Sequence, residues 1–231
     1  MRPPAPFVFE GGAAPARPDR SPSSGFTLLE LLISVAILAL ALGGVYSWFL
    51  STTRAAGVVT TKSELSLSAT RAIDRIAARL LPAGLETLFP PHPTAPLGTS
   101  SLTFNRSQGF VNAQKTWESP TTIEFRLAPG ETDDGLDNDG NGIVDDGQVI
   151  LTVRAGQADE QEIVLCGSVK RYWGTEIANG MDDNGNGLVD EPGLSFELTG
   201  DKIIVRLSMQ ALTFGGKLLT ADVETSVRLR N

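Results

Sequence analysis

The sequence predicts an α+β protein in which one long N-terminal helix is followed by a head rich in β-strands. Two observations predict this class. An apolar run at residues 31–50 passes into an amphipathic pattern, and short β-branched runs recur after residue 120. With 231 residues, the chain is long enough to bury a sizeable core and fits one domain or two small ones.

The composition narrows the classes of function. The chain has one cysteine and one histidine, which excludes an intrachain disulfide, a multi-histidine zinc site and an ordinary Cys-His nucleophile pair. The formal charge is −8, with 27 Asp and Glu against 19 Lys and Arg. This balance argues against a general nucleic-acid surface and favours cation binding or simple solubility. The composition therefore disfavours most familiar enzyme chemistries, and we expect no nucleic-acid partner.

The first element is a predicted transmembrane helix. No charged residue lies between Glu30 and Arg54, and residues 31–50 match the roughly 20 residues that cross a bilayer core of about 30 Å. A cleaved secretory signal is the alternative, but the apolar run is longer than a usual signal core. Residues 1–25 are rich in Pro, Ala and Ser and contain three arginines, which favours a cytoplasmic N-terminus and a head outside the membrane.

The junction before this helix reads Ser-Gly-Phe-Thr-Leu-Leu-Glu at residues 24–30 and resembles the signal of type IV prepilins and type II secretion pseudopilins. The resemblance implies that residues 1–25 are a leader, which a prepilin peptidase removes between Gly25 and Phe26 before Phe26 is N-methylated. Residues 26–53 would remain as the transmembrane and fibre-core helix. Glu30 would pair with the N-terminus of a neighbouring subunit during assembly. The alternative for Glu30 is a helix cap after Thr27.

The helix is predicted to continue through an amphipathic half at residues 54–85. Its apolar stripe comprises Leu65, Ala69, Ile73, Ile76 and Leu80. Pro82 and Gly84 are expected to end the helix, and Gly57 is its likeliest break. In pilin-like proteins, which the junction resembles, this half lies against an antiparallel sheet.

Residues 86–231 are predicted to form a β-rich head. The expected strands are 122–127, 148–154, 162–172, 202–209 and 222–229. Several alternate apolar and polar residues, as expected when one face packs on a helix and the other meets solvent.

Two inserts in the head, at about 133–147 and 179–193, align position by position at a spacing of 45 residues. Each places oxygen ligands at the spacing of the first part of a calcium loop, with a glycine for the tight turn. The candidate ligands are Asp137, Asp139, Asn141, Ile143, Asp145 and Asp146 in the first insert, and Asp182, Asn184, Asn186, Leu188, Asp190 and Glu191 in the second. Ile143 and Leu188 would offer backbone carbonyls. We predict Ca²⁺ in both inserts.

These inserts depart from EF-hands. Gln148 and Gly193 stand where the bidentate carboxylate belongs, so Asp146 and Glu191 are the adjacent candidates for that role. No helix is expected to follow either insert, which predicts calcium loops between strands. The alternative is a pair of Asn/Asp/Gly hairpin turns without metal. Crowding of carboxylates in the first insert favours a cation, because the unliganded charges would repel one another.

The resemblance, in outline to the J-type minor pseudopilins or the W-type minor pilins, implies a structural subunit rather than an enzyme. It would sit in the inner membrane as a single-pass protein with a periplasmic head, and would then assemble with other pilin or pseudopilin subunits into a fibre. Two alternatives remain open. One is an adhesive or DNA-binding minor pilin, and the other is a single-span anchored envelope enzyme.

Overall fold

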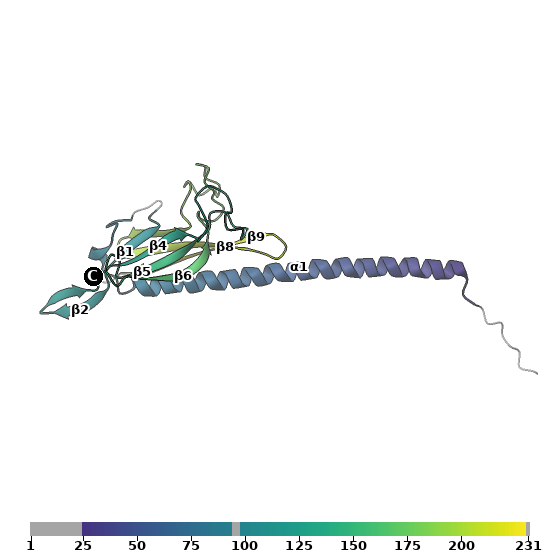
Figure 1. The fold of residues 1–231 in the computed structure, drawn as a ribbon, viewed down its shortest axis with the longest axis horizontal. Helices are drawn as coiled ribbons and strands as arrows, with labels where there is room; N and C mark the ends of the chain where they lie inside the picture. The colour runs from purple at the N-terminus through teal and green to yellow at the C-terminus, as the bar shows by residue number, and fades with distance from the viewer. Residues whose placement is uncertain (1–24, 94–97, 230–231) are drawn as a thin grey trace, which may run out of the picture. The chain divides into compact units, whose positions relative to one another are not determined.

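The computed structural model describes residues 25–93 and 98–229. Apart from Gly25, the predicted leader lies outside these residues. The chain divides into two compact units, Met1–Phe49 and Leu50–Asn231. One helix, α1 (Leu28–Leu80), supplies residues to both units, and an antiparallel sheet follows it in the second (Figure 1). The predicted α+β class is confirmed.

Helix α1 is continuous over 53 residues, so the predicted break at Gly57 is wrong. A glycine inside a helix costs only about 1 kcal/mol relative to alanine, which the hydrogen bonds of the flanking turns outweigh. The helix ends at Leu80, just before the predicted stop at Pro82 and short of the predicted bound at residue 85. The amide of Ala83 donates to the Leu80 carbonyl at 2.8 Å, and Pro82 has no amide with which to continue the ladder.

The second half of α1 packs on the sheet through one stripe of side chains. Its buried residues are Leu65, Ala69, Ala72, Ile73, Ile76 and Leu80, which confirms the predicted stripe and adds Ala72. Apart from the adjacent Ala72 and Ile73, they are spaced by three or four residues, which places them on one helix face. They join sheet residues such as Phe104, Leu151, Phe196 and Leu207 in a single hydrophobic core.

The main sheet has seven strands in the order β1-β4-β5-β6-β8-β7, with β9 also paired to β8. The strands are β1 (Ser101–Phe104), β4 (Thr121–Leu127), β5 (Gly147–Val153), β6 (Gln161–Val169), β7 (Leu194–Thr199), β8 (Lys202–Leu212) and β9 (Leu218–Arg228). All five predicted strands are present. β6 ends at Val169 rather than residue 172, and β1 and β7 were not predicted.

Strand β8 joins the two halves of the sheet. It pairs with β9 along its whole length, and its other edge pairs with β7 from Lys202 to Leu207. Beyond that point it meets β6 at only one pair, Val169 with Met209. The rest of the β6 edge that faces away from β5 therefore lacks a strand partner among the described residues.

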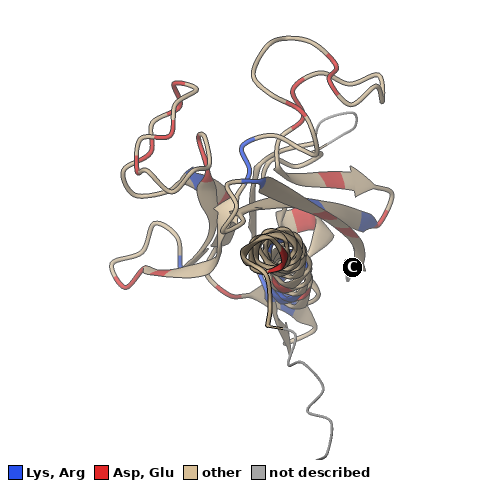
Figure 2. Cartoon of the chain, turned by 90° about the vertical axis from the view of Figure 1, so that its right-hand side faces the viewer, with Lys and Arg blue, Asp and Glu red and all other residues tan. Residues whose placement is uncertain are grey.

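A small hairpin, β2 (Ser107–Val111) and β3 (Gln114–Trp117), forms a second sheet. A 3-10 turn at Leu85–Thr87 leads from α1 toward the head. The two inserts connect β4 to β5 and β6 to β7, which agrees with the prediction of loops between strands. Asp and Glu residues are concentrated on loops that project from the sheet (Figure 2).

Candidate functional site

The junction at the start of α1 forms a capping box. The Thr27 hydroxyl accepts a hydrogen bond from the Glu30 amide at 3.2 Å, and the Glu30 carboxylate accepts from the Thr27 amide at 2.9 Å. This reciprocal pair satisfies amides that the first helical turn leaves without partners. Gly25 and Phe26, the predicted processing residues, precede it and are exposed. Glu30 therefore does cap the helix, as the alternative reading of this residue expects.

The apolar half of α1 is long enough and apolar enough to cross a membrane, and its most apolar window has no buried residue in the structure. Leucine and isoleucine side chains such as Leu31, Ile37 and Leu40 are more than half exposed. Such continuous exposure is costly in water, which makes a lipid or protein environment necessary for this segment.

The two inserts adopt closely similar loops, here named loop 1 (residues 131–146) and loop 2 (residues 176–191). The repeat is longer than the predicted inserts, because Glu131 and Glu176 also correspond at the spacing of 45 residues. The sequence carries this signal in the parallel segments beginning Glu-Thr-Asp-Asp-Gly and Glu-Ile-Ala-Asn-Gly. Neither glutamate was among the predicted ligands.

Asp137 and Asp182 organise the centre of each loop. Each carboxylate accepts hydrogen bonds from three backbone amides, those of residues 140–142 in loop 1 and 185–187 in loop 2. The Gly187 amide is the main cause that lowers the pKa of Asp182. Both carboxylates therefore hold the tight glycine turn of their loop.

Asp145 and Asp190 brace the loops from the other side. Asp145 accepts from the amides of Asp134 and Gly135 at 3.0–3.1 Å. Asp190 accepts from Asn179 and Gly180 in the same way. Both residues have positive φ, 46° and 51°, a conformation that aspartate tolerates better than most residues. Their oxygens thus tie together the backbone of each loop.

Three carboxylates converge in loop 1. Glu131, Asp139 and Asp146 each place an oxygen within 4.8 Å of the other two, which brings two predicted ligands together with one that was not predicted. The Asn141 side-chain amide donates to Asp139 at 3.1 Å and to Asp146 at 3.0 Å. Burial, followed by repulsion from Asp139 and Glu131, raises the pKa of Asp146.

Loop 2 repeats this arrangement with less charge. Glu176 and Glu191 occupy the places of Glu131 and Asp146, but Asn184 stands where loop 1 has Asp139. The side-chain amides of Asn184 and Asn186 donate to the Glu191 carboxylate. At the remaining predicted positions, the amides of Ile143 and Leu188 donate to the Asn141 and Asn186 side chains at 2.7 and 2.8 Å, and Ile143 is buried.

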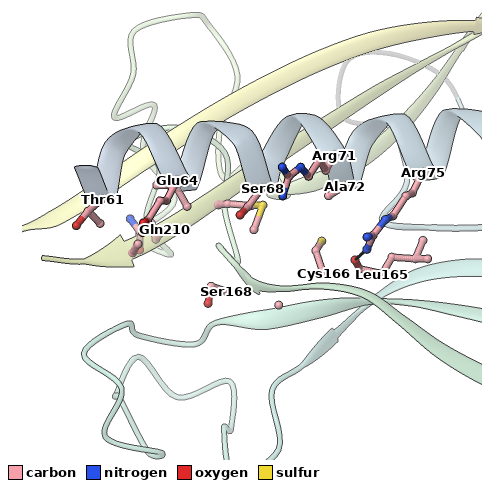
Figure 3. Close-up of a pocket in the computed structure, with 14 residues that line it drawn as sticks. Thr61, Glu64, Ser68, Arg71, Ala72, Arg75, Leu165, Cys166, Ser168 and Gln210 are labelled. Atoms are coloured by element: carbon pink, nitrogen blue, oxygen red, sulfur yellow. Dashed lines mark hydrogen bonds between the residues drawn. The ribbon is translucent and has the colours of Figure 1, made fainter. Parts of the chain in front are cut away.

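A separate cleft of about 470 Å³ lies between α1 and the ends of β6 and β8 (Figure 3). Arg75 donates to the Leu165 carbonyl at 3.1 Å and so covers part of the unpaired edge of β6. Burial raises the pKa of the Cys166 thiol in this cleft to about 11. The thiol is therefore protonated at neutral pH and a poor nucleophile.

The fold and these features support a membrane-anchored α+β protein with one apolar span among the described residues. Residues 20–46 match the family model of the prokaryotic N-terminal methylation motif. No curated protein and no solved structure matches the chain. The methylation motif followed by a long N-terminal helix and a β-sheet head is consistent with a type IV pilin-like protein. It indicates a structural subunit rather than an enzyme.

Proposed function

We propose that this chain is a structural subunit of an envelope-spanning fibre, either a type II secretion pseudopilus or a type IV pilus. The methylation motif at residues 20–46, placed directly on an exposed apolar helix, is the observation that supports this role most strongly. Processing by a prepilin peptidase would leave Phe26 as the new N-terminus and retain the helix. The head would then stand outside the membrane and face other subunits.

Glu30 has a role both before and after processing. In the unprocessed chain its carboxylate is satisfied by Thr27. Cleavage after Gly25 would create an ammonium group on Phe26, next to Thr27. In an apolar environment the Coulomb attraction between such a group and a carboxylate is stronger than in water. The capping geometry supports this proposal because it keeps the carboxylate at the helix start, beside the new terminus. A neighbouring subunit's N-terminus could replace Thr27 as its partner.

We further propose that Ca²⁺ orders the two head loops. Hard oxygen donors, a tight glycine turn and converging carboxylates suit this cation. The chain's own residues would supply the ligands, and the cation would neutralise charges that otherwise repel.

Intact mass tests the structural role. Co-expression with a prepilin peptidase should remove residues 1–25 and add one methyl group, and a Gly25→Ala variant should keep its full mass. An unprocessed wild-type chain in the presence of an active peptidase would overturn the proposal. The calcium titration described below tests the second proposal separately.

A further inference from the structure

Among the acidic side chains of the two loops as the structure describes them, only Glu131 has a buried oxygen without a hydrogen-bond partner. It is only 8% exposed, so more than nine-tenths of the residue is buried. One carboxylate oxygen, Oε1, accepts from the amides of Asn138 and Asp139 at 3.0 and 2.8 Å. The other, Oε2, is buried and accepts no hydrogen bond from any residue in the described part of the chain. A buried charged oxygen without a partner is costly and calls for a ligand.

Repulsion from two neighbouring carboxylates adds a second energetic cost at Glu131. Asp139 and Asp146 place oxygens within 4.8 Å of a Glu131 oxygen, and Asp146 is itself only 2% exposed. At such distances like charges repel strongly unless a cation lies between them. The side-chain amide of Asn141, which donates to both aspartates, offsets part of this repulsion but carries no net charge. A cation placed among the three carboxylates would therefore offset the repulsion more fully than the neutral Asn141 amide does.

The equivalent glutamate in loop 2 is fully satisfied. Glu176 is completely buried, and its Oε1 accepts from the amides of Asp183 and Asn184 at 3.0 Å. Its Oε2 accepts from the Asp190 amide at 3.1 Å, the bond that Glu131 lacks. With Asn184 in place of an aspartate, the positions of loop 2 equivalent to Glu131, Asp139 and Asp146 carry two carboxylates instead of three. Both carboxylate oxygens of the glutamate thus have hydrogen-bond partners in loop 2, whereas only one has them in loop 1.

We propose that Glu131 joins Asp139 and Asp146 as a ligand of a divalent cation, and that loop 1 takes this cation ahead of loop 2. The inference rests on the proposed calcium binding of the head loops. It adds Glu131 as a ligand and the order in which the two loops bind the cation. All three donors are carboxylate oxygens, which select hard cations such as Ca²⁺ over softer metals. Asp145 braces the loop backbone through the amides of Asp134 and Gly135.

The test compares calcium binding to the full chain in detergent micelles after treatment with EDTA. Isothermal titration with CaCl₂ should resolve a tighter and a weaker site in the wild type. Glu131→Gln and Asp139→Asn should each weaken the tighter site by about 10-fold or more, since changes even outside the direct ligands cost 10–100-fold. Asparagine is accommodated at the equivalent position of loop 2, so Asp139→Asn is expected to fold.

The matched control is Glu160→Gln. Glu160 also accepts from a backbone amide, that of Gly156 at 2.7 Å, and lies outside both loops. It should bind calcium like the wild type. Glu131→Gln should also keep or raise its melting temperature in EDTA, because it removes a repelling charge while retaining one acceptor.

Three outcomes separate the possibilities. Wild-type affinity in both Glu131→Gln and Asp139→Asn would overturn this inference and leave calcium binding by the remaining loop residues intact. Loss of the tighter site in Glu176→Gln, with that site unchanged in Glu131→Gln, would overturn the proposed order. A wild-type chain that binds no calcium would overturn both the inference and the proposed calcium role, without touching the structural role tested by intact mass.

Discussion

Glu131 and Glu176 are the same residue type at the same place in two repeats, yet Glu176 accepts three hydrogen bonds and Glu131 accepts two. The amide of Asp190 closes the shell of Glu176, and the corresponding bond to Glu131 Oε2 is absent from the described residues. For these single residues, the bond makes Glu176 a support of the fold, whereas Glu131 keeps one oxygen, Oε2, that can bind a cation. The two glutamates should therefore respond oppositely to the same substitution.

Glu176→Gln should destabilise the head in the absence of calcium. A glutamine can accept at only one of its two terminal atoms, so at least one buried backbone amide would lose its partner. Such a loss costs about 1–3 kcal/mol. Denaturant unfolding of the full chain in detergent and EDTA, followed by tryptophan fluorescence, measures the change. Glu160→Gln serves again as the control. Unchanged stability of Glu176→Gln would show that its three hydrogen bonds do not support the fold.

Contacts of single residues can be predicted from the sequence where the partners lie a few positions apart in the chain. Within the Asp, Asn and Gly repeat, the side chains of Asn141 and Asn186 accept from the amides two residues on, as such residues do in local turns. Glu131 escaped prediction because it lies six residues before the motif, and only the folded loop brings it to Asp139 and Asp146. The contacts of Asp145 with the amides of Asp134 and Gly135 could not be predicted either, because those residues lie 11 and 10 positions earlier in the chain.

At the scale of elements, α1 changes its environment along its length without changing its conformation. Side chains in its first half are exposed, whereas Ile76 and Leu80 are completely buried in the head. The apolar period of the second half predicted this burial, because a stripe at spacings of three and four residues has to find an apolar partner.

Ile76→Ala should therefore destabilise the head by about 2–5 kcal/mol, through lost apolar burial and the cavity that remains. Ile37→Ala is the matched control on the same helix, since Ile37 is 61% exposed in the apolar half. It should leave unfolding of the head unchanged. Denaturant unfolding in detergent compares the two. Equal effects of both substitutions would contradict the division of α1 into an anchor half and a packing half.

In the main sheet, the strands with a long sequence pattern were predicted and the short ones were not. Runs with clear β-branched alternation became β4, β5, β6, β8 and β9. β1 has only four residues, and β7 follows directly on loop 2, so neither offers a long pattern to read. Strand order depends on contacts remote in sequence. In particular, the single pair between Val169 and Met209 that joins β6 to β8 has no local signal.

At the scale of the whole molecule, the chain combines an uncharged anchor with an acidic head. The net charge is −8, and no charged residue lies between Glu30 and Arg54. Glu30 is thus the last charge before the apolar segment. A carboxylate at that boundary is costly unless it is paired, which ties its function to what meets it in the membrane or the fibre.

Glu30→Ala should abolish incorporation into fibres while leaving the head folded, because Glu30 and the buried core lie in different compact units. The substitution also removes the capping box, a local loss of about 0.5–2 kcal/mol at the helix start. Sheared fibre and membrane fractions of a complemented deletion strain measure incorporation. Glu64→Ala, an exposed glutamate in the head half of α1, is the control and should assemble normally.

The same strains distinguish the two fibres that the proposed function allows. If the chain serves a secretion pseudopilus, deletion should stop exoprotein secretion and spare twitching and DNA uptake, and Glu30→Ala should fail to restore secretion. If it serves a type IV pilus, twitching or uptake should fail while secretion continues. Full restoration of the lost activity by Glu30→Ala would show that this carboxylate acts only as a helix cap, because capping affects local stability but recognises no neighbouring subunit.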